Sequence, residues 1–215
     1  MITIAQFKKS YSKAIREGYA AIFAGAGLSK ASGFVEWKEL LNDLAREINL
    51  DVEKESDLVE VAQYYVNEKN SRNEINEKIL NRFITESQES ENIRILSELP
   101  IQIFWTTNYD HLIEDTLKKF GKHVDVKITS ESLATNLSGN DTIVYKMHGD
   151  YTDPAACVII KDDYELYNDK RQLFTTKLHP LLQQSAEHRA LAYAGWAGNN
   201  KRFSSHDPSP SCFFG

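Results

Sequence analysis

The stretch Tyr19-Ala-Ala-Ile-Phe-Ala24, followed at once by Gly25-Ala26-Gly27, decides the fold. A short apolar run that ends in a glycine-rich segment is typical of a buried parallel strand that enters a tight turn. Further strands are expected over residues 101–105, 123–128, 142–147 and 158–160. Because segments with helical periodicity separate these strands, the sequence predicts an α/β domain with a mostly parallel sheet.

Apolar residues recur at helical spacing in the segments between the strands. Helices are expected over residues 1–18, 37–48, 57–69, 72–87, about 112–117 and 162–178. The helices between the first two strands predict a helical insert at about residues 49–98, inside a single domain that spans residues 1–198. Residues 199–215 have no clear period, so we expect a disordered or atypical tail after a truncated or atypical C-terminal part of the domain.

Composition excludes several classes of protein. The net charge of −6 argues against non-specific binding to nucleic acid or to anionic membranes. Two cysteines, Cys157 and Cys212, are too few for a disulfide framework or a four-thiolate zinc site, so no zinc is expected. The sequence has no membrane-length apolar segment and no signal-peptide layout at its start, which predicts a cytoplasmic protein.

Gly25 and Gly27 stand at the carboxyl end of the first expected strand, where open parallel sheets bind ligands. Backbone N–H groups can approach a pyrophosphate closely there because no Cβ intervenes, and the Ser29 hydroxyl can add a donor. Lys30 occupies the position of the third glycine in the usual dinucleotide fingerprint, so the match to that fingerprint is incomplete. A tight turn between a strand and a helix also explains these glycines.

Polar side chains follow two other strands directly. Asn108 and Asp110 come after the strand over 101–105, and His148 comes after the strand over 142–147. An amide and a carboxylate at a sheet edge can hold a ribose, a water or a carboxamide, and a histidine can act as a base near neutral pH. Plainer roles are also open, since Asn and Asp cap helices well and a lone histidine is often structural.

Taken in chain order, three segments resemble the sirtuin family: Gly25-Ala-Gly-Leu-Ser29, Thr107-Asn-Tyr-Asp110 and Met147-His-Gly-Asp150. The resemblance is closer to the bacterial sirtuin-like NAD hydrolases of anti-phage defence, and it covers residues from about 19 to 178. It implies a Rossmann-like fold with NAD lying across the strand ends. Deacetylase sirtuins differ in having Cys-x-x-Cys pairs for a zinc ribbon, which this chain lacks, and usually glutamine where Thr107 stands.

The resemblance also implies a role for each site residue. Asn108 would orient the nicotinamide ribose and the attacking water, Asp110 would support the nicotinamide side, and His148 would be the ribose-side base. The family further implies a homo-oligomer, with a HerA-type ATPase or an Argonaute-like protein as partner. The segment expected to bind the phosphates and ribose of NAD comprises Gly25, Ala26, Gly27, Leu28 and Ser29.

The leading hypothesis is therefore an NAD hydrolase that cleaves the nicotinamide–ribose bond to ADP-ribose and nicotinamide, in anti-phage defence by NAD depletion. NAD would be the substrate. A non-catalytic module that senses NAD or ADP-ribose and regulates a partner is the alternative from another class. A protein deacylase is less favoured because the zinc ribbon is missing.

Overall fold

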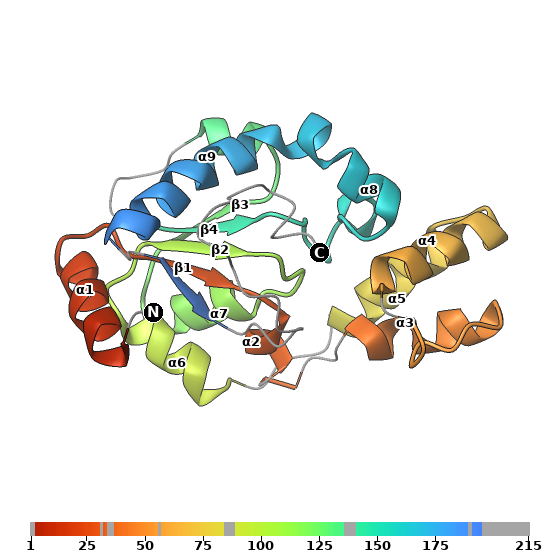
Figure 1. The fold of residues 1–215 in the computed structure, drawn as a ribbon, viewed down its shortest axis with the longest axis horizontal. Helices are drawn as coiled ribbons and strands as arrows, with labels where there is room; N and C mark the ends of the chain where they lie inside the picture. Colours follow the sequence, from red (N-terminus) through yellow and green to blue (C-terminus); the bar gives the residue numbers. More distant parts are fainter. Residues whose placement is uncertain are drawn as a thin grey trace.

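A computed structural model describes residues 3–30, 32–33, 37–55, 57–83, 89–135, 141–188 and 191–194. A five-stranded sheet lies at the centre, in the order β3-β4-β2-β1-β5, and each neighbouring pair of strands is parallel (Figure 1). The prediction of an α/β fold with a parallel sheet is confirmed. The strands are β1 (Ala21–Ala24), β2 (Ile103–Thr106), β3 (Val124–Lys127), β4 (Thr142–Lys146) and β5 (Leu191–Ala194).

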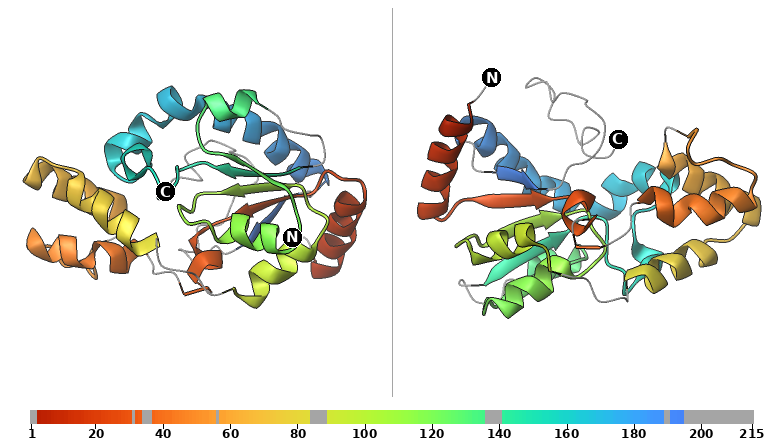
Figure 2. Two further views of the ribbon diagram at one scale, coloured as in Figure 1. Left: turned by 180° about the vertical axis from the view of Figure 1, so that it is seen from behind. Right: turned by 90° about the horizontal axis from the view of Figure 1, so that it is seen from below.

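Helices cover both faces of the sheet (Figures 1 and 2). One face packs against α1 (Ile4–Arg16), α6 (Glu91–Glu98) and α7 (Leu112–Lys119). The other packs against α9 (Tyr167–His188) and the short helix η1 (Glu131–Ala134). A sheet buried on both faces needs strands that are apolar throughout, which explains why these strands read as continuous apolar runs in the sequence.

The alternation of side chains along β1 and β2 shows the two cores directly. Ile22 and Phe104 lie in the core with α1 and α7, whereas Phe23 and Trp105 lie in the core with α9. Tyr145 of β4 joins the second core and stacks on Trp105, with ring centroids 4.1 Å apart. Successive residues of a strand point to opposite faces, so each central strand contributes to both cores.

A helical layer lies beyond the carboxyl ends of the strands (Figure 1). It consists of α3 (Trp37–Glu47), α4 (Leu58–Lys69) and α5 (Asn73–Phe83), and α8 (Lys161–Glu165) lies beside it. Tyr109, which follows β2 closely, packs into the apolar core of these helices together with Ile159 and Ile160. The helical layer is therefore anchored to the segments that follow the strands, where a ligand site is expected.

The structure corrects two expectations about the later part of the chain. Val158–Ile160 is not a strand: its side chains are buried among other side chains, and Asp163 accepts the backbone N–H groups of Ile159 and Ile160. The single helix expected over 162–178 is divided into α8 and α9, and α9 continues to His188. A short apolar run cannot be distinguished by sequence from a buried non-sheet segment, which explains the first error.

Other segments bear on the remaining expectations. The helices α2 (Ala26–Lys30) and α6 had not been anticipated. The tail over 199–215 lies outside the described residues. Within the described ranges, no helix is both long and apolar enough to cross a membrane.

Candidate active site

Three of the expected site residues meet at the carboxyl ends of β1 and β2. The Ser29 hydroxyl donates to Asp110 Oδ2 at 2.7 Å, and Asn108 Nδ2 donates to Ser29 Oγ at 2.8 Å. All three side chains are at least nine-tenths buried, so these hydrogen bonds are shielded from water and hold the group in one arrangement. The segments carrying them are far apart in sequence, and the parallel sheet brings them together.

The amide of Asn108 is oriented by its neighbours. Its Nδ2 group also donates to the Gly25 carbonyl at 3.1 Å, while the backbone N–H of Asn108 donates to Thr106 Oγ1 at 3.0 Å. The Oδ1 atom accepts no hydrogen bond from the described residues. Because both amide hydrogens have acceptors, Oδ1 is the part of this side chain that is left to accept a hydrogen bond from a ligand or a water.

Asp110 serves the local fold and the site together. Its Oδ1 atom accepts the backbone N–H of Leu112 at 3.0 Å, at the start of α7, and its Oδ2 atom accepts the Ser29 hydroxyl. Asp110 precedes the N-cap residue, His111, but it accepts the first N–H of α7, and its second oxygen links it to the segment after β1. Burial raises the pKa of Asp110, although the hydrogen bond from Ser29 opposes the shift.

His148 lies two residues beyond the end of β4. Thr106 and Lys146 are partners in the register of β2 and β4, so Asn108 and His148 follow the strands by the same number of residues. The imidazole is buried, with the rings of Tyr164 and Tyr167 edge-on at 5.5 and 6.1 Å. Burial, with a contribution from the charge of Arg171, lowers the pKa of His148 to about 3. The imidazole is therefore neutral at pH 7.

Gly149 is required by the chain path after His148. Its φ angle is +97°, and a Cβ atom there would lie 3.0 Å from Cys157 Cα and 3.1 Å from Cys157 Sγ. The space that the glycine leaves is filled by the segment before α8. The N–H of Val158 donates to the His148 carbonyl at 2.8 Å, so this close approach also fixes the backbone that carries the imidazole.

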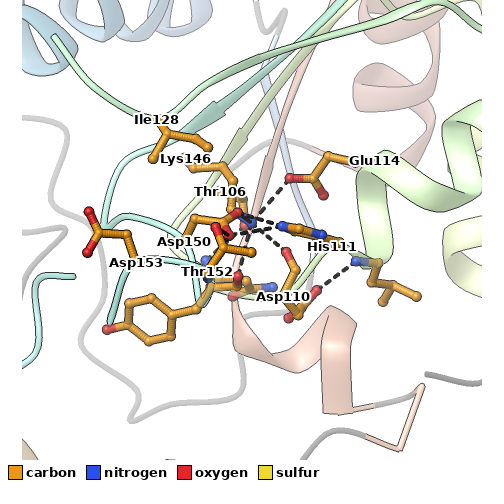
Figure 3. A network of polar contacts seen from close by, with 12 residues as sticks. Thr106, Asp110, His111, Glu114, Ile128, Lys146, Asp150, Thr152 and Asp153 are labelled. Carbon is orange, nitrogen blue, oxygen red and sulfur yellow. Dashed lines mark hydrogen bonds and ion pairs between the residues drawn. The ribbon is translucent and has the colours of Figure 1, made fainter. Parts of the chain in front are cut away.

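A buried charged network lies behind the site residues, with Lys146 at its centre (Figure 3). The Lys146 ammonium donates to the carbonyls of Tyr109 and Asp110 at 3.0 and 2.6 Å. It also forms ion pairs with Asp150 at 2.6 Å and with Glu114 at 3.2 Å. We call residues 107–111 the β2 loop and residues 147–152 the β4 loop; this one ammonium contacts both.

His111 and Asp150 complete the network. His111 Nε2 lies 2.8 Å from Asp150 Oδ2, and the hydroxyl and N–H of Thr152 donate to Asp150 Oδ1 at 2.7 and 3.0 Å. Burial alone would raise the pKa of Asp150, but the hydrogen bond from His111 and the charge of Lys146 lower it well below its usual range. The hydrogen bond to Asp150 raises the pKa of His111. Asp150 is therefore a carboxylate at neutral pH.

The sequence found part of this site and missed the rest. Asn108, Asp110 and Ser29 are proposed from the sequence for contacts with NAD, and in the structure Ser29 is hydrogen-bonded to both of the others. Asp150 ends the third quoted motif and Lys146 directly precedes that motif, but neither residue is assigned a role from the sequence. A lysine at the end of an apolar strand was the signal that could have identified the network, since a buried ammonium requires partners.

No group of three or more His, Cys, Asp or Glu side chains suited to a metal ion occurs in the part of the chain that the structure describes. Cys157 is buried, and burial raises the pKa of its thiol to about 12, so it is a thiol at neutral pH. The absence of zinc remains a prediction from the cysteine count.

The parallel sheet, with a glycine-containing segment after β1 and polar residues after β2 and β4, defines an α/β protein of the Rossmann-like type, in which ligands bind at the carboxyl ends of the strands. A family model described as a SIR2-like domain matches residues 102–206. The chain belongs to this sirtuin-like family, and the resemblance seen in its motifs is confirmed.

Curated relatives match most of the chain. It is 51% identical over 170 residues to the NAD(+) hydrolase ThsA of Cytobacillus dafuensis, which is 79% of this chain and 34% of that protein. It is 54% identical over 162 residues to the NAD(+) hydrolase ThsA of Enterococcus faecium, covering 75% of this chain and 34% of that protein. Defense-associated sirtuin 2 of Bacillus subtilis is 26% identical over 183 residues, covering 81% of this chain and 18% of that protein. The chain thus spans about a third of the length of the ThsA relatives that it matches.

Proposed function

We propose that this protein hydrolyses NAD at the nicotinamide–ribose bond and releases nicotinamide and ADP-ribose. The observation that carries the proposal is the identity of 51–54% to proteins named NAD(+) hydrolase over 75–79% of this chain. That level of identity makes a shared substrate the simplest interpretation. The polar groups gathered at the strand ends are consistent with it, because ligands of open α/β sheets bind at that edge.

Asn108 is proposed to act through its Oδ1 atom. Cleavage passes through an oxocarbenium-like state, so the site must orient the ribose and place a water on the face opposite the departing nicotinamide. An amide whose nitrogen is held by Gly25 and Ser29 presents its oxygen in a fixed direction. That oxygen can accept a hydrogen bond from a ribose hydroxyl or from the attacking water.

His148 is proposed to contact the ribose hydroxyls as a neutral imidazole. With a pKa of about 3 the ring carries no second proton at pH 7, so its unprotonated nitrogen can accept a hydrogen bond from a hydroxyl without prior deprotonation. A neutral ring also adds no positive charge that would oppose the oxocarbenium-like state. A base is most effective when its pKa lies near the working pH, so this low pKa favours an accepting and orienting role in the substrate-free protein.

The segment from Gly25 to Ser29, with Ala26, Gly27 and Leu28 between them, is proposed to hold the phosphates and ribose of NAD. Asp110 is proposed to support the nicotinamide side, through the oxygen that now accepts from Ser29. Because the Ser29 hydroxyl proton is engaged with Asp110, a contact between Ser29 and NAD would use its oxygen as an acceptor or would require the hydroxyl to turn.

We extend the proposal to the biological setting by family resemblance. The name of the Bacillus subtilis relative refers to defence, and we propose a role in anti-phage defence by depletion of NAD in the cytoplasm. A homo-oligomer, with a HerA-type ATPase or an Argonaute-like partner, is the assembly expected from the family. The protein would require no zinc and would not bind nucleic acid directly.

Incubation of the purified chain with NAD, followed by measurement of nicotinamide release, tests the proposed function. We expect nicotinamide and ADP-ribose in equal amounts, with or without an acyl-lysine peptide. Binding of NAD without release would instead support the sensor hypothesis. Release that depends on the peptide, together with formation of an acylated ADP-ribose, would support a deacylase.

A further inference from the structure

Lys146 is the most completely buried charged side chain beside the site, and the roles proposed above do not use it. Its ammonium is fully inaccessible to solvent, and an ammonium in such a place is costly unless every hydrogen finds an acceptor. Three short contacts satisfy it: the carbonyls of Tyr109 and Asp110 and the carboxylate of Asp150. The Glu114 carboxylate adds a fourth, longer contact.

These contacts join two separate segments of the chain. Tyr109 and Asp110 belong to the β2 loop, which carries Asn108, whereas Asp150 belongs to the β4 loop, which carries His148. Figure 3 shows Lys146 with Asp110 and Asp150. A backbone hydrogen bond also joins the two loops. The N–H of Tyr151 donates to the Tyr109 carbonyl at 3.0 Å, an acceptor that it shares with Lys146.

We propose that Lys146 is a positioning residue for NAD cleavage: its ammonium ties the β2 loop to the β4 loop and thereby sets the spacing between Asn108 and His148. The proposal rests on the proposed function. Lys146 itself contacts only protein groups, so it acts through the residues that would touch NAD. Misplacement of a reacting group by about 1 Å can cost roughly 10²-fold in rate, which is the size of effect expected when this link is lost.

The sheet offers a matched control in Lys127, the last residue of β3. Its side chain is 2% exposed, and its ammonium lies 2.8 Å from Asp125 Oδ2 and donates to the Thr135 carbonyl. Neither partner belongs to the β2 loop or the β4 loop. Replacing either lysine by methionine removes a buried ammonium from the end of a strand, but only Lys146→Met removes an ammonium that contacts both loops.

The test compares Lys146→Met, Lys127→Met and the wild-type protein by NAD turnover at saturation, KM for NAD and thermal melting. Hydrogen exchange in peptides that cover residues 107–111 and 147–152 supplies a readout independent of activity. We expect Lys146→Met to lower turnover about 10²-fold, with a change in KM within about threefold, and to speed exchange in both loops. We expect Lys127→Met to melt at a lower temperature while it keeps turnover and loop exchange within about threefold of wild type.

Wild-type turnover in folded Lys146→Met, or an equal loss in Lys127→Met, would overturn the proposal. If Lys146→Met does not fold, the Lys146→Met/Glu114→Gln double variant takes its place. That variant neutralises the carboxylate that would face the lost ammonium, while His111 and Thr152 still hold Asp150. A wild-type protein that cleaves no NAD would overturn the proposed function instead, and loop exchange would then decide alone whether Lys146 joins the two loops.

Discussion

Lys127 and Lys146 end neighbouring strands of one sheet, and both are buried, yet they hold different parts of the molecule. The partners of Lys127 lie within β3 and just after η1, so this lysine stabilises the sheet at its edge strand, β3. The partners of Lys146 lie in the two loops that carry Asn108 and His148. Burial of a charged side chain therefore does not identify a functional residue by itself. Its role depends on which segments of the chain its charged group contacts.

The same contrast extends to the surroundings of each lysine. The β4 loop contains Gly149, against which Cys157 packs closely. It also contains Asp150, whose carboxylate contacts three other side chains. The segment before β3 is more open: Gly121 has no atom near its missing Cβ, and the His123 side chain is 73% exposed. We therefore expect substitutions in the β4 loop to have larger effects than comparable substitutions beside β3.

In this comparison of the β4 loop with the surroundings of β3, the largest expected effect is that of His148→Ala on catalysis. Loss of the imidazole should lower NAD turnover by about 10²-fold or more, because its contact with the ribose matters most as positive charge develops. The affinity for NAD should change much less. Turnover and NAD affinity measured on the same folded sample check this, with His123→Ala as the control near β3. Normal turnover at saturation with collapsed affinity would make His148 a binding residue only.

A second comparison measures how much Gly149→Ala and Gly121→Ala each lower the free energy of unfolding. Both glycines have positive φ, +97° and +74°, but only a Cβ at Gly149 meets backbone atoms, at 3.0 Å. We expect Gly149→Ala to cost about 2–3 kcal/mol and Gly121→Ala about 1 kcal/mol. Chemical denaturation measures both. Equal losses would show that the contact with Cys157 is not a constraint on the β4 loop.

Acid should weaken the fold through His148. Its folded-state pKa of about 3 lies below the usual value of 6.5, so the neutral ring stabilises the folded state above pH 6.5 and this contribution is lost as the pH falls. Each pH unit below 6.5 should cost about 1.4 kcal/mol, hence about 2 kcal/mol at pH 5. The raised pKa of His111 acts in the opposite sense, with a stabilisation that is lost as the pH rises.

Denaturation of the wild-type protein and a His148→Phe variant at pH 7 and pH 5 isolates this contribution. The variant should lose less stability on acidification, whereas His123→Gln, which keeps His148, should lose as much as the wild type. An identical acid dependence in all three proteins would contradict the burial of a neutral imidazole.

The smallest expected effect is that of metal removal. With two cysteines 55 positions apart, a tetrahedral zinc site would need histidines from scattered positions. We expect chelation to leave both NAD turnover and melting unchanged. Elemental analysis of the purified protein checks this directly, and stoichiometric zinc would contradict it.

The sequence predicted the architecture because the central strands are buried on both faces and read as continuous apolar runs. Its failure over 158–160 has the same origin, since apolar residues that pack against helices and loops look identical to a buried strand. The short helices were missed for a related reason. Five residues of α2 are too few for a period to be detected.

The site was predictable only as far as its motifs reach. Asn108, Asp110 and His148 stand out because each directly follows an apolar strand. The neutral state of His148 could not be predicted, because it depends on burial by Tyr164 and Tyr167 and on the charge of Arg171, all from later elements. The role of Lys146 depends in the same way on contacts that only the folded chain creates.

Nicotinamide release from NAD by the wild-type protein and by Asn108→Ala tests the central claim most directly. The substitution removes the side-chain oxygen proposed to orient the ribose or the water, and it breaks two hydrogen bonds, to Gly25 and Ser29. We predict that the wild type releases nicotinamide, whereas the variant stays folded by thermal melting and releases none above the uncatalysed rate. Release by the folded variant at the wild-type rate would contradict the account and leave Asn108 with a structural role alone.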